Sequence, residues 1–233
     1  MLIARLIADP AHLSANSAST LAELRSQGFI AEAEPFGADC VQFSVDGASR
    51  AALAAAMDLH FQPSDMLIAD HVPVAPQLFV SDMDSTMIEA ECIDELADFA
   101  GIKHQIAAIT ERAMQGELDF ESALRERVML LRDLSAGAIA ECLATRIAPM
   151  PGAKVLVETL KGLGCRTVLV TGGFHQFADP VAEQLGFERV VANRLEVVEE
   201  RLTGGLIGGI TDSGVKRTVL LDEAAAIGAG CIS

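Results

Sequence analysis

Two aspartates separated by one residue follow a short apolar run, Leu78–Ser81, in the segment Asp82-Met83-Asp84-Ser85-Thr86. The apolar run is predicted to be a β-strand, so both carboxylates would lie beyond its carboxyl end, where open α/β sheets bind ligands. Two carboxylates this close together are unfavourable unless a cation or hydrogen bonds compensate them. The spacing alone is equally compatible with a ligand site and with a solvated loop that caps a helix.

Two further segments carry groups that could hold an anion. Thr171 follows an apolar run and is followed by Gly172 and Gly173. The hydroxyl and the adjacent N–H groups could hold phosphoryl oxygens, and glycine lets the backbone approach closely, although the same pattern occurs in many turns. Lys216 could supply an ammonium group, but the pair Lys216-Arg217 is also typical of a solvated basic surface. Neither segment carries a G-x-G-x-x-G or Walker pattern, so a nucleotide loop is not indicated.

The net charge of the chain is −16, which disfavours binding to nucleic acid and to anionic membranes. A phosphorylated substrate would therefore need a divalent cation or a few basic side chains near it. No apolar stretch approaches the roughly 18 residues of a membrane-spanning helix, and the N-terminus lacks a secretory pattern, so we expect a cytoplasmic protein. The five cysteines form no C-x-x-C pair, which favours reduced thiols.

The elements expected before residue 72 follow the order βαββαβ, which is the order of a ferredoxin-like module. This N-terminal region, residues 1–72, resembles the small amino-acid-sensing modules called ACT domains in topology only, and a structural or dimerising appendage is an equally good interpretation. The expected strands cover residues 2–8, Phe29–Pro35, Cys40–Val45 and Asp65–Asp70, and the expected helices cover Leu13–Gln27 and Ala48–Met57.

Residues 73–233 are predicted to form a second domain. Residues 71–77 carry two prolines, which disfavour helix and sheet, and they are predicted to be a linker. After the strand Leu78–Ser81, residues 89–148 are predicted to form several helices. A helix over Ala153–Gly162 and a strand over Thr167–Val170 follow. This order predicts a parallel α/β sheet with a helical insertion after its first strand.

The run LFVSDMDSTMIEAECIDELADFAG, which begins at Leu78, resembles the first motif of haloacid dehalogenase phosphatases, specifically of the phosphoserine phosphatase branch. The resemblance implies a Rossmann-like parallel sheet with a helical cap at about residues 89–148. It also implies that Asp82 is the nucleophile, which forms an aspartyl-phosphate, and that Asp84 is the general acid and base. In the family both aspartates contribute oxygen ligands to Mg²⁺, the implied cofactor.

The resemblance extends to the substrate contacts. Glu91 stands at the family position that holds the substrate ammonium, and Arg127, in the run from Gly116 to Val128, stands where an arginine pairs with the substrate carboxylate. Thr171, Gly172, Gly173 and Lys216 stand at the positions that hold the phosphoryl group. Met114 and Phe120 match cap positions around the substrate, whereas periodicity alone predicts that both are core residues.

The function implied by the resemblance is hydrolysis of O-phospho-L-serine to L-serine and phosphate, the last step of serine synthesis from the phosphorylated precursor. The small-molecule substrate is the expected partner, and a homodimer is the candidate assembly. Two alternatives stay open: a non-catalytic amino-acid-binding or regulatory protein with an incomplete metal site, and a phosphatase of the same superfamily that acts on another small phosphorylated metabolite.

The chain departs from the family pattern at its end. Relatives continue past the lysine motif to a buried strand and a Gly-Asp-Gly-Ala-Asn-Asp segment, whose acidic residue completes the magnesium site. This chain ends at Gly230-Cys231-Ile232-Ser233. We therefore expect that the sequence is truncated, that one metal ligand is absent, and that the strand carrying Asp82 becomes an edge strand.

Overall fold

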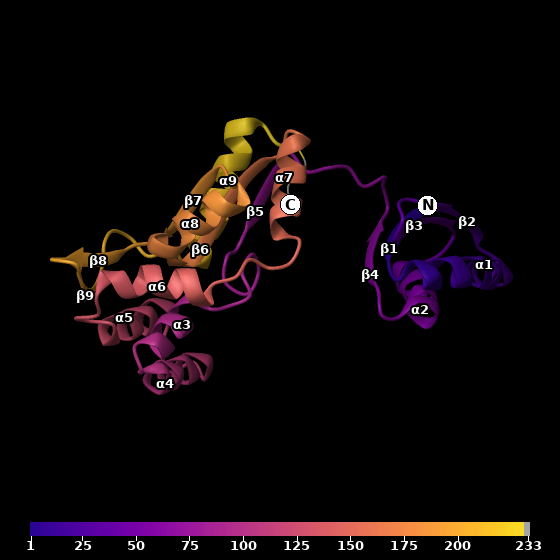
Figure 1. Cartoon of the computed structure of the whole chain (residues 1–233). Helices are drawn as coiled ribbons and strands as arrows, with labels where there is room; N and C mark the ends of the chain where they lie inside the picture. Colours follow the sequence, from indigo (N-terminus) through magenta and orange to yellow (C-terminus); the bar gives the residue numbers. More distant parts are fainter. Residues whose placement is uncertain (231–233) are drawn as a thin grey trace. The chain divides into compact units, whose positions relative to one another are not determined.

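The computed structural model describes residues 1–230, and contacts divide it into two compact units. One unit is Met1–Val74, and the other begins at Ala75. Both are labelled by element in Figure 1.

The N-terminal unit is a four-stranded antiparallel sheet with two helices on one face. The sheet order is β2-β3-β1-β4, and Phe43 and Phe61 pack edge to face in the core between sheet and helices. The order βαββαβ is the predicted ferredoxin-like order, while the sensing role stays a prediction. The elements are β1 (Leu2–Ile7), α1 (Pro10–Ser26), β2 (Ile30–Pro35), β3 (Cys40–Asp46), α2 (Arg50–Phe61) and β4 (Asp65–Ala69).

Both helices of this unit differ in length from the sequence-based prediction. Helix α1 begins three residues earlier than expected, because the Asp9 carboxylate accepts a hydrogen bond from the Ala11 N–H at 2.8 Å and Pro10 suits the first helical position. Helix α2 starts after its capping residue, Ser49, and continues to Phe61, whose ring is buried in the core. Tertiary packing therefore extends α2 beyond the alanine-rich segment.

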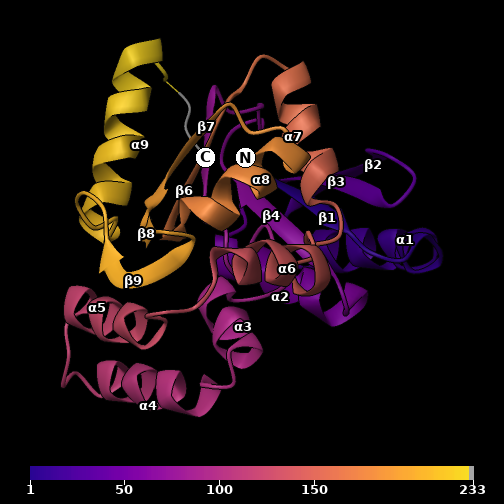
Figure 2. The same ribbon diagram turned by 60° about the vertical axis from the view of Figure 1, so that its left-hand side comes forward.

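The second unit is built on a parallel sheet with the order β5-β6-β7. Helix α9 packs on one face over Leu78, Val168 and Val170, and helices α7 and α8 cover the other face, as Figure 2 shows. Among residues 1–230, β5 pairs with β6 on one side only. The elements are β5 (Leu78–Ser81), α7 (Ala153–Gly162), β6 (Arg166–Phe174), α8 (His175–Leu185), β7 (Arg189–Asn193) and α9 (Ser213–Ile227).

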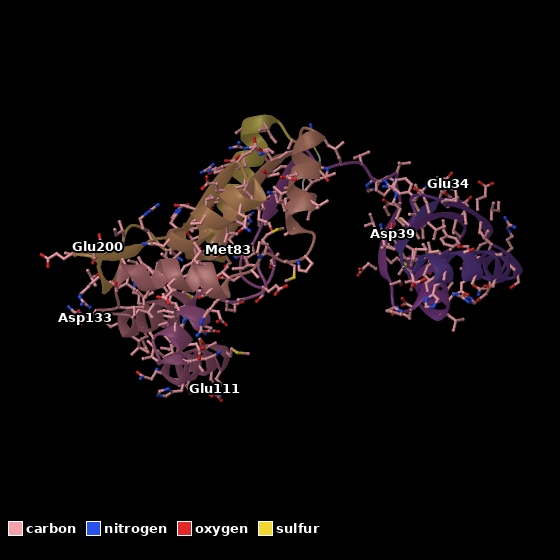
Figure 3. The ribbon with its side chains drawn as sticks, in the orientation of Figure 1. Glu34, Asp39, Met83, Glu111, Asp133 and Glu200 are labelled. Carbon is pink, nitrogen blue, oxygen red and sulfur yellow. The ribbon has the colours of Figure 1, made fainter. Side chains whose placement is uncertain are left out.

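Four helices form a cap between β5 and β6. They are α3 (Cys92–Phe99), α4 (Lys103–Met114), α5 (Phe120–Leu130) and α6 (Ala136–Arg146). A hairpin of β8 (Leu195–Val198) and β9 (Arg201–Leu206) joins the loop between α5 and α6. The Asp133 N–H donates to the Leu202 carbonyl and the Ala136 N–H to the Glu200 carbonyl, each at 2.8 Å. Figure 3 labels Asp133 and Glu200 at this contact.

Within residues 1–230, none of the helices combines the length and the apolar character needed to cross a membrane. Cys40, Cys92 and Cys142 are free thiols in the same part of the chain. The predictions that concern Cys231 and the last residues lie outside the described residues.

A buried carboxylate ties α9 to the amino ends of two strands. Glu223 accepts hydrogen bonds from Arg166, at 3.2 Å from Nε to Oε2, and from Arg189. Burial raises the pKa of Glu223, but the two arginines outweigh it and hold that pKa below its ordinary value of 4.5. The network lies at the end of the sheet opposite the carboxyl ends of the strands, so its role is to stabilise the fold.

The substitution Glu223→Gln is expected to lower the free energy of unfolding by about 1–3 kcal/mol near neutral pH. Because the folded pKa of Glu223 is depressed, its contribution is complete above 4.5 and is lost as the pH falls through the folded pKa. Denaturant unfolding near pH 7 and at about pH 4 measures the free energy of unfolding of both proteins. The difference in that free energy between Glu223→Gln and the parent should be smaller at the lower pH. An equal loss in the exposed neighbour variant Asp222→Asn would contradict the assignment.

Candidate active site

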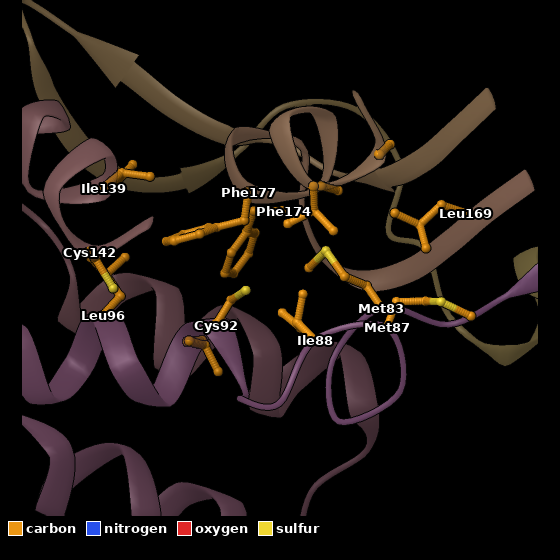
Figure 4. Packing of buried hydrophobic residues seen from close by; sticks show 14 of the residues in the cluster. Met83, Met87, Ile88, Cys92, Leu96, Ile139, Cys142, Leu169, Phe174 and Phe177 are labelled. Atoms are coloured by element: carbon orange, nitrogen blue, oxygen red, sulfur yellow. The ribbon is translucent and has the colours of Figure 1, made fainter. Parts of the chain in front are cut away.

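The two aspartates after β5 are held by a methionine between them. Met83 is fully buried and packs in the hydrophobic cluster with Phe174 and Phe177, as Figure 4 shows. Its carbonyl accepts hydrogen bonds from the N–H groups of residues 86, 87 and 88 at 2.8–3.2 Å. Asp82 and Asp84 flank this anchor and line a pocket. Because Met83 is anchored in the hydrophobic cluster, the residues on either side of it turn away from the cluster and toward the pocket.

Strand β6 supplies the hydroxyl and the paired glycines. It continues to Phe174, four residues beyond the expected Thr167–Val170, and its register with β7 shifts between Val170 and Phe174. This bulge takes Thr171, Gly172 and Gly173 out of the regular ladder and toward the pocket that they line. A Cβ on Gly173 would lie 3.0 Å from Asp84 Oδ2 and 3.2 Å from Thr171 Oγ1, so any side chain at this position would crowd both functional groups.

Helix α9 supplies a cation. Asp212 caps the helix by accepting a hydrogen bond from the Val215 N–H at 2.8 Å. Lys216, in the first turn, places Nζ 2.5 Å from Asp82 Oδ2. Arg217 is exposed. The structure therefore brings Lys216, rather than its basic neighbour, to the Asp82 carboxylate.

The cap contributes the other wall of the pocket. Glu91 precedes α3 and accepts a hydrogen bond from Ser85 Oγ at 2.8 Å. Arg127 lies on α5. Burial lowers the pKa of its guanidinium, and the nearby Asp94 and Glu91 carboxylates offset only part of this change. The Phe120 ring reaches strand β6, because a Cβ on Gly172 would lie 3.1 Å from its Cζ. One acidic and one basic side chain of the cap therefore line the same pocket as the groups that come from β5, β6 and α9.

One pocket of about 450 Å³ is lined by all eight residues that were predicted to take part in catalysis or to bind the substrate or metal directly; Met114, predicted only to surround the substrate, is not among its lining residues. Their roles stay predictions, but their proximity is a property of the fold. Several other lining residues were not predicted from the sequence. Among them, only Asp212 could have been noticed, because an aspartate just before a helix is typical of a helix cap. The lining residues are Asp82, Asp84, Glu91, Ile93, Phe120, Leu124, Arg127, Thr171, Gly172, Gly173, Phe174, Thr211, Asp212, Ser213 and Lys216.

Two expectations for the cap residues need correction. Periodicity predicted that Met114 and Phe120 are core residues, but they are 84% and 44% exposed. Phe120 lines the pocket, whereas Met114 does not. Helix periodicity finds the apolar positions of a cap but cannot tell a core face from a face turned to a ligand.

The electrostatic environment separates the two aspartates. Burial, together with the negative charges of Glu91 and Asp82, raises the pKa of Asp84 to about 6, and hydrogen bonds from Cys92 partly oppose this rise. Asp82 instead faces the Lys216 ammonium. A carboxyl with a pKa near neutral can donate and accept a proton, as an acid–base group must, and the Lys216 ammonium offsets negative charge at Asp82, as a nucleophile that meets a phosphoryl group requires.

Hard oxygen donors are available for a divalent cation. Asp82 and Asp84 line the same pocket, and their mutual repulsion is the kind that Mg²⁺ relieves. The donor chemistry therefore fits magnesium. Within the described part of the chain, no group of three or more His, Cys, Asp or Glu side chains is placed to hold a metal.

The family model for haloacid dehalogenase-like hydrolases matches residues 79–229. The chain belongs to this family. The predicted α/β fold class of a haloacid dehalogenase-like hydrolase is thereby confirmed, and so is the family resemblance.

Several proteins that are similar to this chain are named phosphoserine phosphatases. One from Streptococcus thermophilus is 46% identical over 148 residues, which are 64% of this chain and 68% of the relative. The crystal structure of a probable phosphoserine phosphatase from Vibrio cholerae has a TM-score of 0.76 and is 29% identical. The match covers 97% of this chain and 68% of the Vibrio cholerae chain. A structure described as a phospho-aspartyl intermediate analogue of phosphoserine phosphatase has a TM-score of 0.61 and is 36% identical. The match covers 66% of this chain and 74% of the chain in that structure.

The match is shorter than the relatives themselves. Across eight curated phosphoserine phosphatases, the matched residues span from 37% to 68% of the relative's length. The comparisons therefore establish the haloacid dehalogenase-like hydrolase family for residues 79–229.

Proposed function

We propose that this hydrolase converts O-phospho-L-serine and water to L-serine and phosphate through an aspartyl-phosphate on Asp82. The observation that carries the proposal is the division of the pocket. Asp82, Thr171 and Lys216 lie on the core side, and Glu91 and Arg127 belong to the cap side. A phosphoryl group on one side and an amino acid on the other match these charges.

The first half of the reaction uses both aspartates. Asp82 Oδ attacks phosphorus, the bond from phosphorus to the serine oxygen breaks, and Asp84 gives its proton to that oxygen. A pKa of about 6 leaves part of Asp84 protonated near neutral pH. In the second half Asp84 takes a proton from water, which attacks phosphorus and returns Asp82 to its carboxylate form.

The surrounding groups stabilise negative charge. The Lys216 ammonium lies beside the Asp82 carboxylate, so it can contact a phosphoryl oxygen at the same place. The Thr171 hydroxyl and the Gly172 N–H would hold the other oxygens, and the Gly173 N–H supports them by donating to Thr171 Oγ1 at 2.9 Å. Asp82 and Asp84 would hold the Mg²⁺ ion, which would supply further neutralisation of the phosphoryl oxygens.

The remaining parts of the proposal concern the setting of the reaction. We propose a cytoplasmic enzyme of serine biosynthesis, with Glu91 and Arg127 as the groups that select an amino acid. Assembly as a homodimer, and the division into an N-terminal module and a phosphatase domain with its cap, belong to the same proposal.

A comparison of three phosphate esters tests the substrate. O-phospho-L-serine carries both an ammonium and a carboxylate group, O-phosphoethanolamine lacks the carboxylate, and phosphoglycerate has a hydroxyl in place of the ammonium. We expect kcat/KM to fall by roughly 10- to 100-fold for each analogue, as for one lost contact to a charged group. Equal or faster hydrolysis of either analogue would identify a phosphatase for another metabolite.

The substitution Arg127→Lys serves as the matched test of the carboxylate contact. A lysine keeps the charge but cannot form the bidentate contact of a guanidinium. The expected result is a rise in KM for O-phospho-L-serine of about 10-fold, with little change for O-phosphoethanolamine. A similar loss for both substrates would show that Arg127 acts on the cap and not on the substrate carboxylate.

A further inference from the structure

The side chain of Asn193, the last residue of β7, connects two segments of the pocket wall. Its Nδ2 donates to the Gly172 carbonyl oxygen at 2.7 Å, and its Oδ1 accepts a hydrogen bond from the Thr211 N–H at 2.8 Å. Asn193 is 1% exposed, so water does not compete for either bond. Gly172 and Thr211 line the pocket, whereas Asn193 lies behind them.

The first of these bonds determines the direction of a neighbouring N–H group. A peptide group is planar and trans, so the Gly172 carbonyl and the Gly173 N–H point in opposite directions. Because Asn193 holds the carbonyl, the N–H of Gly173 is directed to Thr171 Oγ1, to which it donates at 2.9 Å. This bond fixes the Thr171 hydroxyl oxygen, and the hydroxyl proton is left to donate to a phosphoryl oxygen, which is the role proposed for Thr171.

The second bond determines where α9 begins. Thr211 immediately precedes Asp212, whose carboxylate caps the helix and whose carbonyl accepts the Lys216 N–H at 3.0 Å. A shift of Thr211 would therefore move the first turn of α9. The Lys216 ammonium would move with that turn, away from the Asp82 carboxylate that it contacts.

We infer that Asn193 is a positioning residue that couples the Thr171 hydroxyl, held through the Gly173 N–H, and the Lys216 ammonium, so that both converge on one phosphoryl group. The inference rests on the proposed function for the identity of the ligand. It assigns to a buried amide outside the pocket the alignment of donors that come from two separate elements, β6 and α9.

The substitution Asn193→Asp tests this coupling, because it replaces one nitrogen by oxygen without a change of shape. The carboxylate can still accept from Thr211, but it repels the Gly172 carbonyl. With MgCl₂ present, we expect calorimetry to show affinity for inorganic phosphate weakened roughly tenfold, the effect of one hydrogen bond to a charged group. Affinity for L-serine, which the proposal assigns to Glu91 and Arg127, should stay unchanged.

The matched control is Gln176→Glu. Gln176 makes the same kind of paired contact, donating to the Leu195 carbonyl at 2.8 Å and accepting from the Leu195 N–H at 3.2 Å, but it lies outside the pocket. The inference is overturned if Asn193→Asp binds phosphate within twofold of the parent, if Gln176→Glu loses as much, or if the unsubstituted chain does not bind phosphate.

A second pair of variants covers a failure to fold. Should Asn193→Asp not fold, Asn193→Ala and Gln176→Ala are compared by the same criteria, since neither places a charge in the interior. The phosphate comparison decides the inference even for a chain without turnover. A parent chain that binds phosphate but does not hydrolyse O-phospho-L-serine contradicts the proposed function alone.

Discussion

Replacement of Asp82 by asparagine is expected to abolish hydrolysis of O-phospho-L-serine, with kcat lowered by roughly 10⁴-fold or more. The amide has nearly the shape of the carboxylate but is a poor nucleophile, so the aspartyl-phosphate cannot form. Steady-state release of phosphate measures the loss. A rapid acid quench with labelled substrate should trap phosphate on the parent protein and none on the variant.

The control for this experiment is Asp222→Asn, which removes the same charge from an exposed position on α9. It should retain the parent rate and the trapped intermediate. Turnover by Asp82→Asn above about one hundredth of the parent rate would exclude Asp82 as the nucleophile. Binding of L-serine without turnover by the parent protein would instead favour the non-catalytic alternative.

Removal of the ammonium group in Lys216→Ala should lower kcat/KM for O-phospho-L-serine by roughly 10²- to 10³-fold. In the folded protein Lys216 Nζ lies 2.5 Å from Asp82 Oδ2, so its loss leaves the nucleophile and the incoming phosphoryl group without a cation to offset their repulsion. The loss should be visible in kcat as well as in KM, because charge on the phosphoryl oxygens is redistributed during transfer.

Arg217→Ala is the comparison that gives this result its meaning. The two side chains are adjacent in sequence and carry the same charge, but Arg217 is exposed. We expect less than a twofold effect from its loss, as for an ordinary surface substitution. Comparable losses in both variants would indicate that the general field of the helix, and not a contact at Asp82, is responsible.

Much of the site could be predicted because its residues carry local signals. Asp82 and Asp84 follow a short apolar strand, and the observed β5, Leu78–Ser81, has the expected bounds. Helix α7, Ala153–Gly162, also has the expected bounds, since Gly152 stands just before its first residue and Gly162 is its last residue. Family resemblance, and not spacing, supplied the cap residues Glu91 and Arg127.

The remainder depends on contacts between distant segments. Nothing in the sequence near Asn193 indicates that its amide would bridge Gly172 and Thr211, because both partners are backbone groups that any residue could supply. The extension of β6 to Phe174 was missed for a related reason: paired glycines are typical of turns, and only the pairing with β7 shows that the strand continues beyond them.

The β8–β9 hairpin constrains how the active site can admit a substrate. Main-chain hydrogen bonds join it to residues 133, 134 and 136 of the cap, so a cap that swings outward must either break these bonds or carry the hairpin with it. The hairpin continues directly from Asn193 and returns toward Thr211. Any rotation that exposes the interior would therefore also pull on the end of β7 and on the segment that precedes α9, both of which flank the phosphate-binding side. Admission of the amino acid is thus linked to the order of the groups that receive its phosphate.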